Sequence, residues 1–158
     1  MKNQKGLLIF LIKFFVIFII LSTLIEFANL LFLREFITFI SASYLSLPFS
    51  GTTIFVENSI FLVSSSCTGL VSSAILVALL FSSKKPTPIS KIFLAIFGVC
   101  LLLLLNVPRV MLVLVTAKLG FDADLVHTIT WFIMSAFVLV IWYYGNKSIG
   151  VKDFSKLI

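Results

Sequence analysis

The sequence predicts an all-α integral membrane protein with about four transmembrane helices, an interfacial helix and a short extracytoplasmic β-hairpin-like segment. Of its 158 residues, 61% are hydrophobic and only 11% are charged, whereas soluble domains carry about 25% charged residues. Apolar runs long enough to cross a bilayer, which takes about 20 residues, recur along the chain. We therefore expect one membrane-embedded domain over residues 1–158, with several passes through the cell membrane.

The first apolar run, residues 7–33, is predicted to be a retained first span rather than a cleaved signal peptide. It is longer than the core of a signal peptide and lacks a small-residue cleavage site. Residues 34–49 follow with apolar side chains at a rough helical spacing. They predict an interfacial amphipathic helix that ends near Pro48.

A short β-hairpin is expected after this helix. Two β-rich runs, residues 52–56 and 59–63, flank Glu57 and Asn58, and turn residues between strand formers are typical of a hairpin. Because unpaired strands are not stable in lipid, the hairpin is expected at the membrane surface or over the mouth of the bundle. Glu57 is interpreted as a solvated turn residue, with contact to substrate as the alternative.

Three further spans are expected in the rest of the chain. The second span, residues 67–81, is short, and the third and fourth cover residues 89–116 and 126–144. Pro108 interrupts the third span and is expected to bend it. Aromatic residues at the end of the fourth span are typical of a membrane interface.

The basic residues predict the orientation of these spans. With four spans both termini share one side, and positive charge favours the cytoplasmic side of short loops. The side of the termini holds Lys2, Lys5, Lys84, Lys85, Lys91, Lys147, Lys152 and Lys156, against Arg34, Arg109 and Lys118 on the other. The termini are therefore expected in the cytoplasm and the hairpin outside. Because the charges are clustered between apolar runs, binding to nucleic acid is not expected.

Three chemically distinctive side chains are expected at one depth near the outer surface. Cys67 begins the second span within the serine-rich segment VSSSCTGLVSS, and His127, the only histidine, begins the fourth. Arg109 follows Ile89 by 20 residues, which is about 30 Å along the third span. Cys100 lies inside an apolar stretch and is expected to be a small buried packing residue.

This combination indicates a cysteine hydrolase or transferase. A thiolate is the nucleophilic form of cysteine, and the start of a helix, here expected to be capped by serines, favours it. Arg109 offers donors suited to an oxyanion or a carboxylate, and Asn106 lies one turn earlier on the same helical face. His127 follows two aspartates at a helix start, where the dipole opposes a positive charge and the aspartates favour it, so its charge state stays open.

The sequence resembles the exosortase/archaeosortase family of membrane transpeptidases over roughly residues 50–135. The resemblance lies in the hairpin-like segment and in the ordered motifs Cys67-Thr68-Gly69-Leu70, Asn106-Val107-Pro108-Arg109-Val110 and His127. The form Cys-Thr-Gly is more similar to the archaeosortase branch. The chain departs from larger members in having few spans and no additional domain, which leaves its subfamily and its partner signal open.

The resemblance implies a catalytic triad and a substrate class. The triad falls on Cys67, Arg109 and His127, and the substrates are secreted proteins with a C-terminal sorting signal made of a motif, a transmembrane segment and a basic tail. Cys67 is expected to form a thioester that water, or an amine on a lipid or surface polymer, then resolves. His127 moves protons, and Arg109 stabilises the oxyanion or holds the substrate.

Supporting residues and cofactors complete this expectation. Asn106 is expected to orient Arg109. Thr68 and Gly69 are expected either to let the substrate backbone approach closely or to pack helices together, and the sequence does not decide between the two. No metal and no cofactor are expected.

Two other interpretations remain open at this point. A non-enzymatic membrane assembly or scaffold protein would use the polar residues only to pack helices, and their side chains would point in unrelated directions. A redox membrane protein would use Cys67 and Cys100 as a pair, which requires Cα atoms within about 7 Å. The depths argue against this pair, because Cys100 precedes Arg109 by nine residues, which is about 13 Å along the third span.

Overall fold

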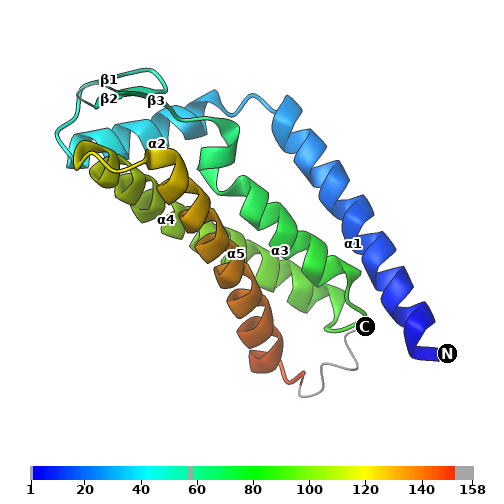
Figure 1. The fold of residues 1–158 in the computed structure, drawn as a ribbon. Helices are drawn as coiled ribbons and strands as arrows, with labels where there is room; N and C mark the ends of the chain where they lie inside the picture. Colours follow the sequence, from blue (N-terminus) through cyan, green and yellow to red (C-terminus); the bar gives the residue numbers. More distant parts are fainter. Residues whose placement is uncertain (1, 57–58, 152–158) are drawn as a thin grey trace.

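The computed structural model describes residues 2–56 and 59–151, and it forms a helical bundle that carries a small sheet at one end (Figure 1). The helices are α1 (Lys2–Phe27), α2 (Leu31–Tyr44), α3 (Leu70–Ser82), α4 (Pro88–Lys118) and α5 (Ala123–Ser148), with a 3-10 helix η1 (Ser65–Thr68) before α3. In Figure 1, α1 and α4 run towards the sheet, while α3 and α5 run away from it.

The first predicted span is divided into two helices. Helix α1 ends at Phe27, and α2 begins at Leu31 and lies across the end of the bundle under the sheet (Figure 1). The side-chain oxygen of Asn29 accepts a hydrogen bond from the backbone N–H of Leu31 at 3.2 Å, and such local bonds compete with helix continuation. The predicted span over residues 7–33 is therefore too long, and Arg34 lies inside α2 rather than beyond a span.

The sheet has three antiparallel strands in the order β1 (Phe49–Ser50), β2 (Thr53–Val56) and β3 (Ser59–Leu62). The predicted hairpin is confirmed as the pairing of β2 with β3, in which Thr53 faces Leu62. The two-residue strand β1 was not predicted, because it is too short to show an alternating pattern. The predicted turn at Glu57 and Asn58, and any role of Glu57, lie outside the described residues.

Helix α3 is shorter than the second span that the sequence predicts. It contains 13 residues, which is about 20 Å and less than the roughly 30 Å of a bilayer core. Among the described residues, three helices are long and apolar enough to cross a membrane: Gln4–Phe27 of α1, α4 and α5. The chain is therefore a multi-pass membrane protein, and three spans rather than four meet the length criterion.

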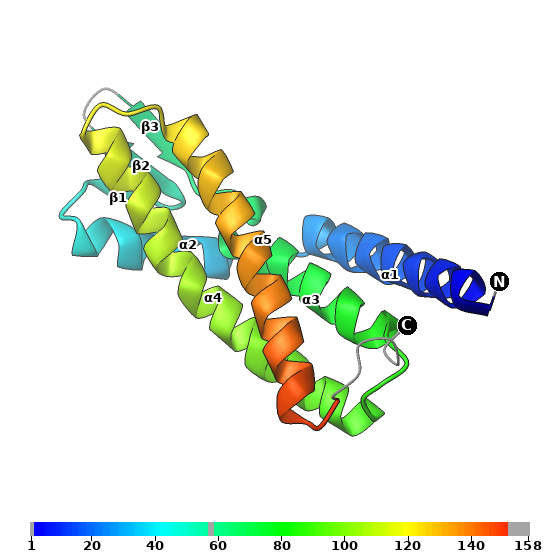
Figure 2. The same cartoon turned by 60° about the horizontal axis from the view of Figure 1, so that its bottom comes forward.

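Helix α3 is the centre of the bundle. It packs against α1 on one side and against α4 and α5 on the other (Figures 1 and 2). Its buried leucines Leu76 and Leu80 form one apolar cluster with residues of α4 and α5, including Leu102 and Val138. A second apolar cluster lies under the sheet and joins α2, β2 and α4.

Candidate active site

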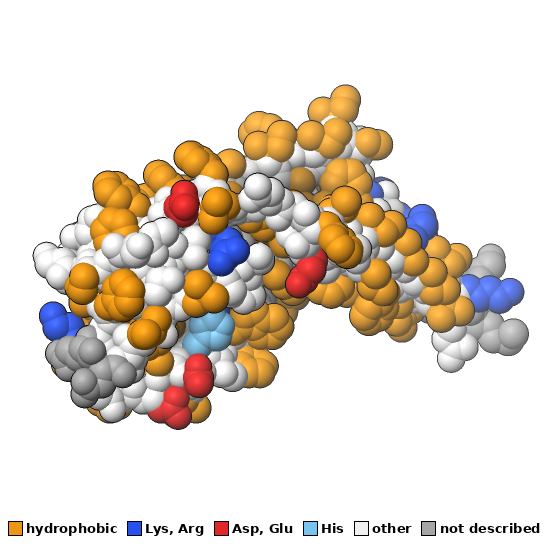
Figure 3. All heavy atoms as spheres, turned by 90° about the horizontal axis from the view of Figure 1, so that it is seen from above, with side chains coloured by type: hydrophobic (Ala, Val, Ile, Leu, Met, Phe, Trp, Pro, Cys, Tyr) orange, Lys and Arg blue, Asp and Glu red, His pale blue; other side chains and the backbone are white. Residues whose placement is uncertain are grey.

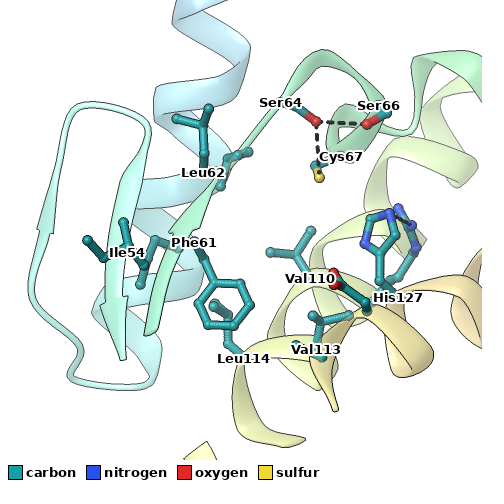
Figure 4. A pocket seen from close by; sticks show the side chains of 15 residues that line it. Ile54, Phe61, Leu62, Ser64, Ser66, Cys67, Val110, Val113, Leu114 and His127 are labelled. Carbon is teal, nitrogen blue, oxygen red and sulfur yellow. Dashed lines mark hydrogen bonds between the residues drawn. The ribbon is translucent and has the colours of Figure 1, made fainter. Parts of the chain in front are cut away.

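A pocket of about 330 Å³ lies at the sheet end of the bundle, between β2, β3 and the segment that follows them on one side and α4 and α5 on the other. Cys67, Arg109 and His127 all line this pocket. Figure 4 shows the sulfur of Cys67 and the ring of His127 facing the same space. The structure thus brings together the three residues that the sequence placed at one depth.

Cys67 lies in the 3-10 helix η1 and not in the first turn of α3. Its backbone N–H donates to the carbonyl oxygen of Ser64 at 3.0 Å, and its sulfur lies 3.5 Å from the hydroxyl of Ser64 (Figure 4). Helix α3 begins only at Leu70, after Gly69 adopts a left-handed conformation with φ of 82°. The expected capping of α3 by serines before Cys67 is therefore wrong, and the hydroxyl of Ser64 is the polar group beside the thiol.

Arg109 contacts three polar side chains of the site at once, and it is buried, with 7% of its surface exposed. Its guanidinium donates from Nη1 to Asn106 Oδ1 at 3.1 Å and from Nε to Thr130 Oγ1 at 3.3 Å. Its Nη2 lies 3.3 Å from Nε2 of His127. Because a guanidinium has only donors, Nε2 of His127 must be the acceptor in this bond, and the imidazole then carries its proton on Nδ1.

Asn106 connects the nucleophile segment to the guanidinium. Its side chain is fully buried. The amide nitrogen donates to the carbonyl oxygen of Cys67, while the amide oxygen accepts from Arg109. Helix α4 continues through Pro108, and Asn106 and Arg109 both face the interior, as their spacing of one turn predicts.

Thr130 is a polar contact of the site that the sequence reasoning missed. Its hydroxyl donates to the carbonyl oxygen of His127 at 2.9 Å and accepts from Nε of Arg109. It lies one turn after His127, so the i, i+3 spacing was the available signal. His127 itself is partly buried, and a histidine is visible at the surface when the molecule is viewed onto its sheet end (Figure 3).

Thr68 and Gly69 do not line the pocket. Thr68 is fully buried, and its hydroxyl donates to the carbonyl oxygen of Ser65 at 2.6 Å. A β-carbon added to Gly69 would lie 3.0 Å from Cβ of Asn106. Of the two roles left open by the sequence, these contacts favour packing over a close approach of substrate.

Replacing Gly69 with alanine is expected to destabilise the protein. Its left-handed backbone costs a non-glycine residue about 1–2 kcal/mol, and the new methyl group would press on Asn106. Thermal unfolding of the detergent-solubilised chain measures the loss. Gly120→Ala is the matched control, because Gly120 has a similar φ of 80° and a β-carbon added there would meet no atom within 4 Å. Equal losses for the two variants would contradict the packing role of Gly69.

Cys100 is exposed on the outside of α4, so the expectation that it is a buried packing residue is wrong. It precedes Arg109 by nine residues, which is 2.5 helical turns and places the two side chains on opposite faces of α4. Both cysteines are unpaired. The redox interpretation, which needs Cys67 beside Cys100, has no support in this arrangement.

The arrangement suits covalent chemistry by a thiol. Cys67, Arg109 and His127 converge on one pocket, whereas the scaffold interpretation expects unrelated directions. Among residues 2–56 and 59–151, no group of three or more histidine, cysteine, aspartate or glutamate side chains is placed to hold a metal ion. A nucleophile, a proton carrier and a fixed cation are the parts of a cysteine-dependent acyl-transfer site.

Comparison with known proteins identifies the family. The family model described as "Transmembrane exosortase" matches residues 2–144, which is most of the chain and includes the whole pocket. No curated protein and no solved structure matches the chain significantly. The extent of the family match shows that this chain belongs to the transmembrane exosortase family.

Proposed function

We propose that the protein is a membrane cysteine transpeptidase that cleaves the C-terminal sorting signal of secreted proteins and transfers them to an anchor. The observation that carries this proposal is the convergence of Cys67, Arg109 and His127 from three separate segments on one pocket. Membership of the exosortase family supports the reaction class and the substrate class. The Cys67-Thr68-Gly69 motif favours an archaeosortase-like branch.

The first step is attack by the sulfur of Cys67 on the scissile carbonyl carbon. His127 takes the thiol proton at Nε2, which removes the lone pair that accepts from Nη2 of Arg109. Nη2 then loses its acceptor and becomes available to the oxyanion that forms on the carbonyl oxygen. Asn106 and Thr130 keep their bonds to Nη1 and Nε, so the guanidinium stays in place during this change.

In the second step the tetrahedral adduct on Cys67 collapses to a thioester, and in the third the thioester is broken. The imidazolium of His127 gives its proton to the amine of the departing C-terminal fragment, and a thioester on Cys67 remains. An amine on a membrane lipid or surface polymer then attacks the thioester carbon. His127 accepts the proton of this amine, and the thiolate of Cys67 leaves. Attack by water in place of the amine gives hydrolysis instead of transfer.

The positions of the lysines support a membrane topology that suits the proposed reaction. We place the pocket on the extracytoplasmic side, because Lys5, Lys84, Lys85 and Lys147 belong to the opposite end of the bundle, where α1 begins, α3 meets α4, and α5 ends (Figure 1). Helix α3 together with η1 would serve as a fourth, short span, since α1, α4 and α5 surround it. Both termini are then cytoplasmic.

Trapping with hydroxylamine tests the thioester. Membranes with the full chain are incubated with a reporter whose C-terminal sorting signal is taken from the same genome, and the new C-terminus is analysed by mass spectrometry. Hydroxylamine attacks thioesters, so the expected product carries a C-terminal hydroxamic acid in a dose-dependent way. A processed product whose C-terminus never responds to hydroxylamine would contradict the covalent mechanism.

A further inference from the structure

The pocket beside Cys67 has a polar end and an apolar end, and the mechanism above uses only the polar end. The apolar end has Ile54 and Phe61 of the sheet on one side and Val110, Val113 and Leu114 of α4 on the other (Figure 4). We propose that this end is a specificity subsite that receives one apolar side chain of the substrate next to the scissile bond. The inference rests on the proposed transpeptidase function.

The apolar end is continuous with the position of the nucleophile. Ile54, Val110 and Leu114 are buried members of one apolar cluster, and both Phe61 and Cys67 pack against it. A peptide carbonyl held at the sulfur of Cys67 therefore has the cluster beside it. A side chain on a residue next to that carbonyl has this apolar space within reach.

The walls of the subsite are held in place. Arg34 of α2 donates from Nε to the carbonyl oxygen of Val63 at 2.7 Å and from Nη2 to the hydroxyl of Thr52 at 3.4 Å. Thr52 and Val63 are neighbours at the open end of the β2–β3 pair, so both bonds tie that end of the sheet to α2. The wall on α4 belongs to a continuous helix, so the space between them is formed before a substrate arrives.

The size and chemistry of the pocket fit a bulky apolar group. An apolar cavity of about 150 Å³ binds benzene, and this pocket has about 330 Å³, which leaves space for an aromatic or branched side chain and the peptide carbonyl. The side chains of Ile54, Val113 and Leu114 offer no hydrogen-bond partner. A polar or charged group placed there would lose its hydration without compensation.

Labelling of Cys67 with alkylthiolating reagents tests this inference without turnover. The probes are methyl and benzyl methanethiosulfonate, applied to the full chain in detergent or vesicles. The cysteine thiolate attacks the sulfenyl sulfur, a disulfide to the alkylthio group forms, and methanesulfinate leaves with the electron pair of the broken S–S bond. Cys100→Ala is the background for all variants, so that labelling reports on Cys67 alone, and free cysteine in solution is the reference thiol.

Free cysteine corrects for the different intrinsic reactivities of the two reagents, and partitioning of the reagents into the membrane is the same for all the variants compared below. The measured quantity is the ratio of the benzyl rate to the methyl rate at Cys67, divided by the same ratio for free cysteine. We expect this quotient to be about tenfold above one, the range that apolar pockets achieve for small differences in apolar groups.

Substitutions of Val113 locate the effect. Val113→Phe fills the apolar end and is expected to lower the quotient about tenfold, while Val113→Thr keeps nearly the same size and is expected to lower it several-fold by adding a hydroxyl. Val115→Phe is the matched control, since Val115 lies on the exposed side of the same helix, and it is expected to leave the quotient unchanged. The Val113→Thr variant keeps the test valid if the larger side chain prevents folding.

The outcomes separate this inference from the proposed function. A quotient near one, or a quotient that neither Val113 variant lowers, overturns the subsite even where processing depends on Cys67. A quotient that responds as expected in a chain with no Cys67-dependent processing overturns the proposed function, and with it the assignment of the pocket to a substrate side chain.

Discussion

Replacing Cys67 with alanine is expected to reduce processing of a sorting-signal substrate to background, a loss of several orders of magnitude. The alanine has no sulfur to form the thioester, and no other side chain of the pocket offers a comparable nucleophile beside Arg109 and His127. The measurement is the rate of substrate cleavage in membranes that contain equal amounts of wild-type and variant protein.

Cys100→Ala is the control for this experiment. Cys100 is an unpaired thiol on the outer face of α4, away from the pocket, so its loss is expected to leave the rate within about twofold of wild type, as is usual for surface substitutions. Normal processing by the Cys67→Ala variant would contradict the catalytic role of Cys67. The serine-rich segment would then be explained by helix packing.

Replacing Arg109 with lysine is expected to lower turnover by about 10²–10³-fold, the effect of losing one oxyanion donor. The guanidinium contacts Asn106, Thr130 and His127 at the same time, and a lysine ammonium has neither the planar fork nor the reach to replace these bonds. Lysine keeps the positive charge, so the loss would show that donor geometry matters beyond charge.

The readout is the turnover number and the Michaelis constant, measured separately, with thermal unfolding as a check on folding. A loss in the turnover number with a nearly constant Michaelis constant is expected if Arg109 acts in the transition state. The neutral variant Arg109→Gln is expected to be slower still. An Arg109→Lys variant that turns over at the wild-type rate would contradict the assigned role.

The membrane character of the chain and the common depth of the site residues follow from the sequence alone. Apolar length and composition identify membrane helices because a bilayer core has a fixed thickness. A helix rises by about 1.5 Å per residue, so counting from Ile89 to Arg109 sets a depth without any knowledge of packing. The hairpin was also predictable, because residues 52–63 contain both strand formers and turn residues, and their pairing is local.

Helix rotation, breaks and partners were decided only by the tertiary structure. Hydropathy is the same for a residue that faces lipid and one that faces another helix, which is why Cys100 was expected to be buried and is exposed. The left-handed Gly69 separates η1, which contains Cys67, from α3, and it lies so close to α4 that an added β-carbon would be 3.0 Å from Cβ of Asn106. The bond from Arg109 to Thr130 and the apolar wall that β2 and β3 bring to the pocket likewise join segments far apart in sequence. Such contacts depend on how the helices and the sheet pack in three dimensions, and a linear pattern of residue types does not specify that packing.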